Sequence, residues 1–256
     1  MTPLVLVHGV GLDRHMWAAF AAALGSPTIT YDMLGLGDAP KPAGPYTLSM
    51  YAEQLADVVR EAPSQPVDVI GFSMGALVAQ RFAIDHPSLV RRLVLVSGVY
   101  DRTSAERAAI VARVEEVRAG GYASTIEPAI ARWFTPEFAA THPHEVDAVR
   151  TRMLANDPAS YVHAYEVFAT GDEELVPLVH RIAAPTLVVT GADDQRSTPT
   201  MTQRLAEALP HGEAAVVPDV RHLLPLEQPR LLAELVDEFL NRDLNRDPNP
   251  AEGTND

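Results

Sequence analysis

The chain has 256 residues, 47% of them hydrophobic and 21% charged, which is the composition of a globular protein long enough for one domain with an insertion. Its 20 basic and 34 acidic side chains give a formal net charge of -14 with no basic stripe, so nucleic acid and anionic membranes are not expected as partners. There is no cysteine, no signal-peptide pattern and no stretch that approaches a membrane span, and a cytoplasmic location is expected.

Apolar runs and helical patterns alternate through the first hundred residues. The runs at 4–7, 28–31, 67–70 and 93–96 predict strands, and the segments 13–24, 47–61 and 76–83 predict helices. Glycine and proline are too dense in 32–45 for regular structure, which indicates a loop. The alternation predicts an α/β fold in which helices cover both faces of a parallel sheet.

The alternation stops after Ser97 and only helical patterns follow. Helices are expected at 104–119, 123–134, 136–156, 158–169 and 172–182. Strands at 186–190 and 214–217 and helices at 200–209 and 227–242 then resume the first pattern, and the polar segment 243–256 is expected to be a disordered tail. The prediction is a core of residues 1–99 and 184–242, with an all-helical cap at 100–183.

A G-x-S-x-G pattern, formed by Gly71, Ser73 and Gly75, lies between a predicted strand and a predicted helix. A serine on such a sharp turn is exposed to substrate, and glycines on both sides let strand and helix approach closely. The helix N-terminus behind the serine favours a developing negative charge. The pattern alone fits an ordinary turn about as well, and its strand and helix context favours a nucleophile.

A serine nucleophile needs a base, usually a histidine held by a carboxylate. His222 directly follows the last predicted strand, and Asp193 and Asp194 follow the strand before it. The competing interpretations are a solvated loop histidine and an Asx turn. The order Ser, Asp, His, with each residue at the C-terminal end of a predicted parallel strand, favours a catalytic triad over both.

Five motifs together resemble those of the α/β-hydrolase superfamily. They are L-V-L-V-H-G-V-G at 4–11, Y-D-M-L-G-L-G at 31–37, V-I-G-F-S-M-G at 69–75, T-L-V-V-T-G-A-D-D at 186–194 and V-R-H-L-L-P-L-E-Q-P at 220–229. The resemblance implies Ser73 as nucleophile, His222 as base and Asp194 as acid. It also implies the backbone N–H groups of Val10 and Met74 as oxyanion donors, and neither a metal nor an organic cofactor.

The chain departs from the family pattern in two ways. It begins almost at the H-G strand without the usual preceding strand pair, so we expect a mostly parallel sheet of about six strands with 28–31 at an exposed edge. Pro199 lies one residue further from the acid than usual, which leaves Asp193 open as the acid and Asp101 as a third choice.

The residues that bind substrate are harder to predict. Trp133, Phe134, Phe138 and Leu223 are candidates for the pocket, and so are four further residues of the insert, Met153, Tyr161, Tyr165 and Phe168. Most such side chains would equally form the core of the cap. His142 and His144 have the look of a metal pair, but a solvated surface is the stronger interpretation because no second cluster completes a site.

The sequence therefore predicts a serine hydrolase that cleaves a small-molecule carboxylic ester or lactone. The same residues would also serve a carbon–carbon bond hydrolase of vinylogous diketones, or perhydrolase and haloperoxidase-type chemistry. A ligand-binding protein on a hydrolase scaffold is a further alternative, which the intact triad disfavours. A homodimer through the edge strand or the cap is left open.

Overall fold

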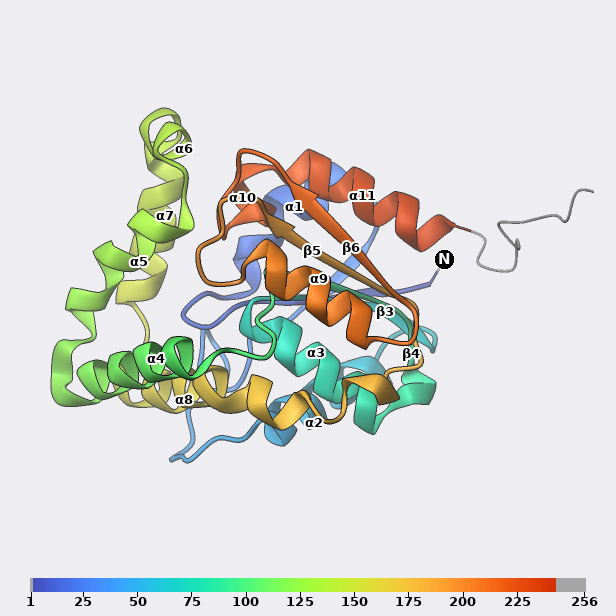
Figure 1. Ribbon diagram of the computed structural model, residues 1–256, viewed down its shortest axis with the longest axis horizontal. Coiled ribbons are helices and arrows are strands. Elements are labelled where there is room, and N and C mark those ends of the chain that lie inside the picture. Colours follow the sequence, from blue (N-terminus) through green and yellow to red (C-terminus); the bar gives the residue numbers. More distant parts are fainter. Residues whose placement is uncertain (1, 243–256) are drawn as a thin grey trace, which may run out of the picture.

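The computed structural model describes residues 2–242, and the tail predicted at 243–256 lies outside this range. Six parallel strands form one sheet in the order β2-β1-β3-β4-β5-β6 (Figure 1). The strands are β1 (Leu4–Val7), β2 (Thr28–Thr30), β3 (Val67–Phe72), β4 (Val90–Val96), β5 (Thr186–Gly191) and β6 (Gly212–Val217). The predicted fold class is confirmed, and β2 lies at an edge of the sheet as expected.

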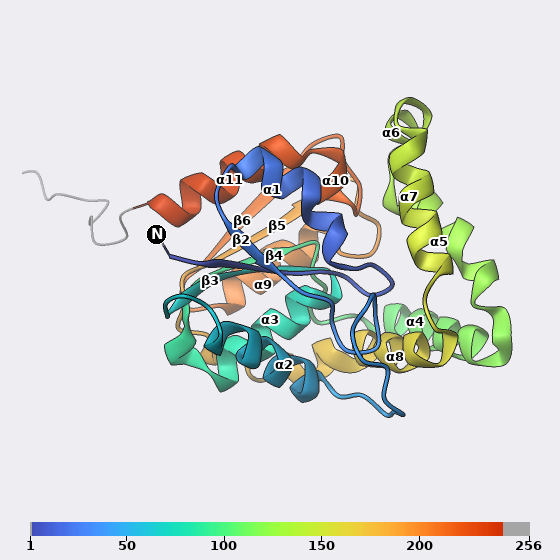
Figure 2. The same ribbon diagram turned by 180° about the vertical axis from the view of Figure 1, so that it is seen from behind.

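Helices cover both faces of this sheet. On one face lie α1 (Ala18–Leu24) and α11 (Pro229–Asn241), and on the other α2 (Leu48–Arg60), α3 (Met74–Asp85) and α9 (Pro199–Ala208) (Figures 1 and 2). The central strands β1 and β3 are buried along their whole length because both of their faces are covered. The order of strands brings the C-terminal ends of β1, β3 and β5 to one edge, where ligands bind in sheets of this kind.

The helical insert, as we call the segment from α4 to α8, stands beside the sheet over this edge (Figures 1 and 2). Its helices are α4 (Ser104–Glu116), α5 (Ile126–Trp133), α6 (Pro136–Thr141), α7 (Pro143–Leu154) and α8 (Pro158–Leu175), and a π-helical turn at Val117–Gly121 follows α4. A short helix, α10 (Leu224–Glu227), lies between β6 and α11.

Two boundaries predicted within the insert are wrong. The helix expected at 136–156 is two helices, because Pro143 begins a new one after His142 leaves helical geometry (φ -127°, ψ 54°). The helices expected at 158–169 and 172–182 are one helix to Leu175, which continues through Gly171. A side chain at Gly171 would lie 3.1 Å from Leu77 of α3, so the glycine allows α8 to pack closely on the core.

A buried ion pair joins the insert to the core. The Asp172 carboxylate on α8 lies 2.7 Å from the Arg102 guanidinium and also accepts the Arg102 backbone N–H at 3.0 Å. Because these groups satisfy each other away from water, they hold α8 to the segment that leaves β4.

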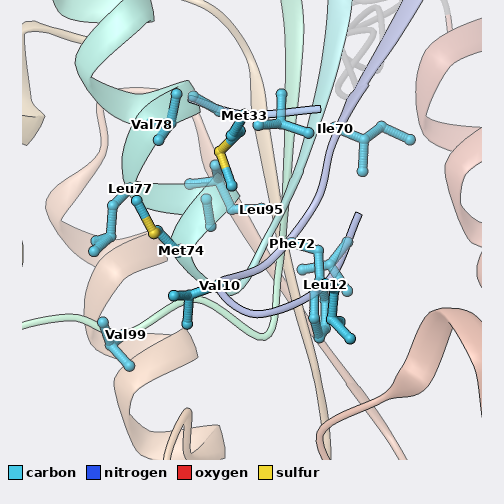
Figure 3. Close-up of a cluster of buried hydrophobic side chains, with 14 of the residues drawn as sticks. Val10, Leu12, Met33, Ile70, Phe72, Met74, Leu77, Val78, Leu95 and Val99 are labelled. Atoms are coloured by element: carbon cyan, nitrogen blue, oxygen red, sulfur yellow. The ribbon is translucent and has the colours of Figure 1, made fainter. Parts of the chain in front are cut away.

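The main hydrophobic core lies on both sides of the sheet and extends into the insert. Figure 3 shows the part of it beside the sheet's functional edge, which includes Val10, Phe72, Met74 and Leu77. Among residues 2–242, no helix is both long enough and apolar enough to cross a membrane.

Candidate active site

Ser73 occupies a strained turn between β3 and α3. Its φ of 54° and ψ of -113° lie outside the regions that side chains favour. A Cβ at Gly71 would lie 2.2 Å from the Gly75 carbonyl oxygen, and one at Gly75 would lie 2.4 Å from the Val7 carbonyl oxygen. Only glycine therefore fits at either position, and the predicted reason for the G-x-S-x-G spacing holds in this chain.

His222 and Asp194 complete a chain of contacts with Ser73. His222 Nε2 lies 3.2 Å from Ser73 Oγ, and His222 Nδ1 lies 2.7 Å from Asp194 Oδ2. All three side chains are buried. Asp194 Oδ1 accepts the backbone N–H groups of Arg196 and Ser197 at 2.9 and 3.0 Å, which fixes the carboxylate opposite the imidazole. In this arrangement Nδ1 donates to Asp194 and Nε2 is free to accept the serine proton.

The two other candidate acids lie elsewhere. Asp193 is exposed, and its backbone N–H donates to the Val220 carbonyl at 3.1 Å. Asp101 forms an ion pair with Arg204. The carboxylate that contacts His222 is that of Asp194.

The two predicted oxyanion donors, Val10 and Met74, lie on different elements. Val10 lines the same cavity as Ser73, and Met74 is the first residue of α3, where the backbone N–H has no acceptor within the helix. His8 holds the loop that carries Val10. Its Nε2 accepts the Met33 N–H at 2.9 Å and its Nδ1 donates to the Gly9 carbonyl at 2.8 Å. Burial lowers the pKa of His8, consistent with this neutral tautomer.

The helical insert contacts the same loop from the other side. Asn156, between α7 and α8, donates from Nδ2 to the Gly11 carbonyl at 2.9 Å, and Arg152 Nε lies 2.6 Å from Asp13. The loop beside Val10 is therefore held by the core through His8 and by the insert through Asn156.

A narrow cavity of about 60 Å³ opens above Ser73. Its walls come from the loops that carry Ser73, Asp194 and His222 and from the helical insert. The lining residues are Val10, Ser73, Arg113, Thr125, Ala129, Arg132, Trp133, Met153, Tyr161, Tyr165, Phe168, Asp194, Gln195, Arg196 and His222. The ring of Trp133 lies 5.9 Å from that of His222.

Of the first four pocket candidates, Trp133, Phe134, Phe138 and Leu223, only Trp133 lines this cavity. Phe134 is buried and stacks on Phe138, which in turn stacks on His142 and faces a separate surface hollow. Leu223 is fully buried, and its N–H donates to the Trp133 carbonyl at 3.1 Å. Phe134, Phe138 and Leu223 therefore do not line this cavity, because apolar type alone does not distinguish a residue of the cavity wall from a residue packed behind it. Met153, Tyr161, Tyr165 and Phe168 do line the cavity.

Three arginines in the cavity were not predicted: Arg113, Arg132 and Arg196. The sequence contains only weak indications that these arginines line the cavity. Arg113 lies between the buried residues Ile110 and Val114 on the inner side of α4, Arg132 precedes Trp133, and Arg196 follows Asp194 by two residues. Each signal fits a solvated surface equally well until the fold brings the three elements together.

The remaining candidates do not form a site. His142 and His144 are exposed, and within residues 2–242 no three His, Asp or Glu side chains are grouped closely enough to hold a metal ion. A larger surface groove, of about 650 Å³, runs between α1 and α11, but its lining includes none of the residues around Ser73. The narrower cavity is therefore the candidate active site.

Comparisons with known proteins identify the family. The family model described as alpha/beta hydrolase fold matches residues 2–229. The (E)-2-((N-methylformamido)methylene)succinate hydrolase of Acinetobacter baylyi is 31% identical over 242 residues, which cover 93% of this chain and 90% of that protein. The 3-oxoadipate enol-lactonase 2 of the same organism is 27% identical over 241 residues, which cover 93% of this chain and 88% of that protein.

Solved structures give the same result. An enol-lactonase from Burkholderia xenovorans is 26% identical, with a TM-score of 0.85, and the match covers 94% of this chain and 92% of that one. An esterase from Thermogutta terrifontis is 27% identical, with a TM-score of 0.84, and the match covers 94% of this chain and 89% of that one. The chain is thus similar to hydrolases along nearly all of its described length.

Proposed function

Because this chain belongs to the alpha/beta hydrolase fold family, we propose that it is a serine hydrolase that cleaves a small-molecule carboxylic ester or lactone. The observation that carries the proposal is the buried contact chain from Ser73 Oγ through His222 to Asp194, which opens into a cavity. The esterase and the enol-lactonases among the similar proteins support an ester or lactone carbonyl as the target.

In the proposed mechanism, Ser73 Oγ attacks the carbonyl carbon while His222 Nε2 takes the hydroxyl proton. Asp194 stabilises the resulting imidazolium. The N–H groups of Val10 and Met74 donate to the oxyanion, and each such donor lowers the barrier by about 3–4 kcal/mol. His222 then protonates the leaving alkoxide, which yields the acyl-enzyme.

Water completes the cycle. His222 removes a proton from a water molecule, which attacks the acyl carbonyl, and the imidazolium returns that proton to Ser73 Oγ as the acid leaves. For a lactone substrate the alkoxide stays attached to the acyl group, so one hydroxy acid is the only product. The strained Ser73 backbone fits this role, since it presents Oγ to the cavity rather than capping α3.

Covalent labelling tests the proposal. We expect a fluorophosphonate probe to label the protein, and Ser73→Ala to abolish both labelling and hydrolysis of 4-nitrophenyl acetate and γ-butyrolactone. Ser88→Ala is the matched control, because Ser88 is exposed and lies away from the cavity. Equal labelling of the wild type and Ser73→Ala would rule out Ser73 as the nucleophile.

A further inference from the structure

Three arginine side chains converge on the cavity above Ser73 from three separate elements. Arg113 comes from α4, Arg132 from α5 and Arg196 from the loop between β5 and α9. We propose that they form a carboxylate-binding subsite, so that the substrate carries a carboxylate in addition to the bond that is cleaved. This inference rests on the proposed function for its place in a reaction, but the binding site itself can be tested separately.

The first argument is the absence of a protein counterion. In the part of the chain that the structure describes, neither Arg113, Arg132 nor Arg196 forms a side-chain ion pair; the Arg113 guanidinium donates only to the Tyr165 hydroxyl, at 3.3 Å. Most other arginines of the insert are paired, as Arg150 is with Glu127 and Asp147.

The acidic groups beside the cluster are already engaged. Asp194 contacts His222 and two backbone N–H groups. Glu106 lines a neighbouring hollow that also includes Arg113 and Arg196, but its carboxylate accepts the Thr103 N–H at 2.7 Å in the cap of α4. The cluster therefore presents uncompensated positive charge to the cavity.

The second argument is the cost of this arrangement. Burial lowers the pKa of Arg132, and the nearby charges of Arg113 and Arg196 lower it further. The protein has a net charge of -14, yet three like charges surround this cavity: Arg113 and Arg132 are half-buried, Arg196 is exposed, and the three repel one another. A bound carboxylate would relieve the repulsion, and the same charges would draw an anion toward a protein that otherwise repels it.

The third argument is the shape and chemistry of the surroundings. Tyr161, Tyr165 and Phe168 form an apolar wall, and burial keeps Tyr161 protonated by raising its pKa well above the ordinary value. A planar guanidinium pairs with a planar carboxylate through two parallel hydrogen bonds. A narrow cavity with aromatic walls suits a flat carboxylate on a short apolar chain better than a tetrahedral phosphate.

A pair of matched esters tests the subsite in catalysis. We expect the wild type to prefer monoethyl succinate, which carries a carboxylate, over ethyl pentanoate, its neutral counterpart, by about tenfold or more in kcat/KM. Arg132→Gln should lower kcat/KM for monoethyl succinate by about 10–100-fold, and for ethyl pentanoate by much less. Arg150→Gln is the control, because Arg150 is paired on the outer side of the insert and should leave the preference unchanged. No preference in the wild type would overturn the proposal.

A binding measurement separates this proposal from the hydrolase proposal. Succinate should bind to Ser73→Ala by calorimetry and raise its melting temperature, and Arg132→Gln added to that variant should weaken binding about tenfold or more. Without succinate, the double variant should have a melting temperature equal to or above that of Ser73→Ala, because one of three like charges is removed. Succinate binding without fluorophosphonate labelling of the wild type would retain the subsite and reject the hydrolase. Labelling without succinate binding, or phosphate binding as tightly as succinate, would reject the carboxylate subsite.

Discussion

The cavity above Ser73 has two sides, a floor formed by the core and a roof formed by the helical insert, and they are built in different ways. The floor consists of Ser73, Asp194 and His222, and a hydrogen bond to the backbone of each ties it to the sheet or to a strand end. Ser73 N–H donates to the Val96 carbonyl at 2.9 Å, Asp194 N–H donates to the Gly191 carbonyl at 3.2 Å, and Ser97 Oγ donates to the His222 carbonyl at 3.1 Å. The roof comes from the helical insert, which is joined to the core by separate contacts, such as those of Asn156 with Gly11 and of Leu223 N–H with the Trp133 carbonyl. In the proposed function, the reaction chemistry is thus placed on the sheet and substrate recognition on the helical insert.

We therefore expect changes in the floor to abolish most of the rate and changes in the roof to alter it less. A change in the floor removes a group that acts on the reacting atoms. A change in the roof alters how well the loop beside Val10, or the substrate, is held. The largest expected effect is therefore in the floor.

Asp194→Asn should lower kcat by about 10⁴-fold with little loss of stability. An amide at this position would no longer hold the tautomer of His222 that accepts the serine proton, and it could not balance the imidazolium. Steady-state hydrolysis of 4-nitrophenyl acetate and a thermal melt measure the two effects. Asp193→Asn, a change to the exposed neighbour, is the control and should alter kcat by less than about threefold. A large loss of kcat in Asp193→Asn and not in Asp194→Asn would mean that Asp193 is the acid and that the choice of Asp194 is wrong.

The floor could be predicted from sequence because local rules determine it. Gly71 is required by a contact within the turn, with the Gly75 carbonyl, and Gly75 by the close approach of the neighbouring strand β1 at Val7. The parallel order of strands carries Asp194 and His222 to the same edge as Ser73. Strand ends are marked by apolar runs that stop at glycine or polar residues, so their positions follow from pattern alone.

The roof could not be predicted to the same depth. Whether Phe138 packs outside the cavity or Phe168 lines it depends on how α5 to α8 are rotated, and an aromatic residue at helical spacing fits both cases. The three arginines lie 19 and 64 residues apart in sequence and meet only through the tertiary fold. The break before Pro143 and the continuation through Gly171 shift the register of the helices on which such a prediction would rest.

Asn156→Ala tests how much the roof contributes to the reaction itself. We expect kcat to fall about tenfold with KM nearly unchanged, because Gly11 loses the hydrogen bond that helps to hold Val10. The affinity for a boronic acid, whose tetrahedral adduct resembles the intermediate, should fall in parallel. A purely structural role would instead reduce the fraction of enzyme that fluorophosphonate labels and leave kcat per labelled site intact. Asn241→Ala, at the exposed end of α11, is the control.

The smallest effect is expected at His8, which holds the same loop from the core. Burial lowers its pKa from 6.5, so the unfolded chain binds the proton more readily, and stability that is present above pH 6.5 is lost as the pH falls toward the lowered value. His8→Gln keeps an acceptor within reach of Met33 N–H but does not titrate. Between about pH 6.5 and 5.5 the wild type should therefore lose up to about 1.4 kcal/mol more unfolding free energy than this variant, as measured by urea titration. His180→Gln, in which an exposed imidazole is replaced, should keep the wild-type slope. Equal slopes in all three proteins would mean that His8 is not the buried neutral imidazole that the contacts with Met33 and Gly9 require.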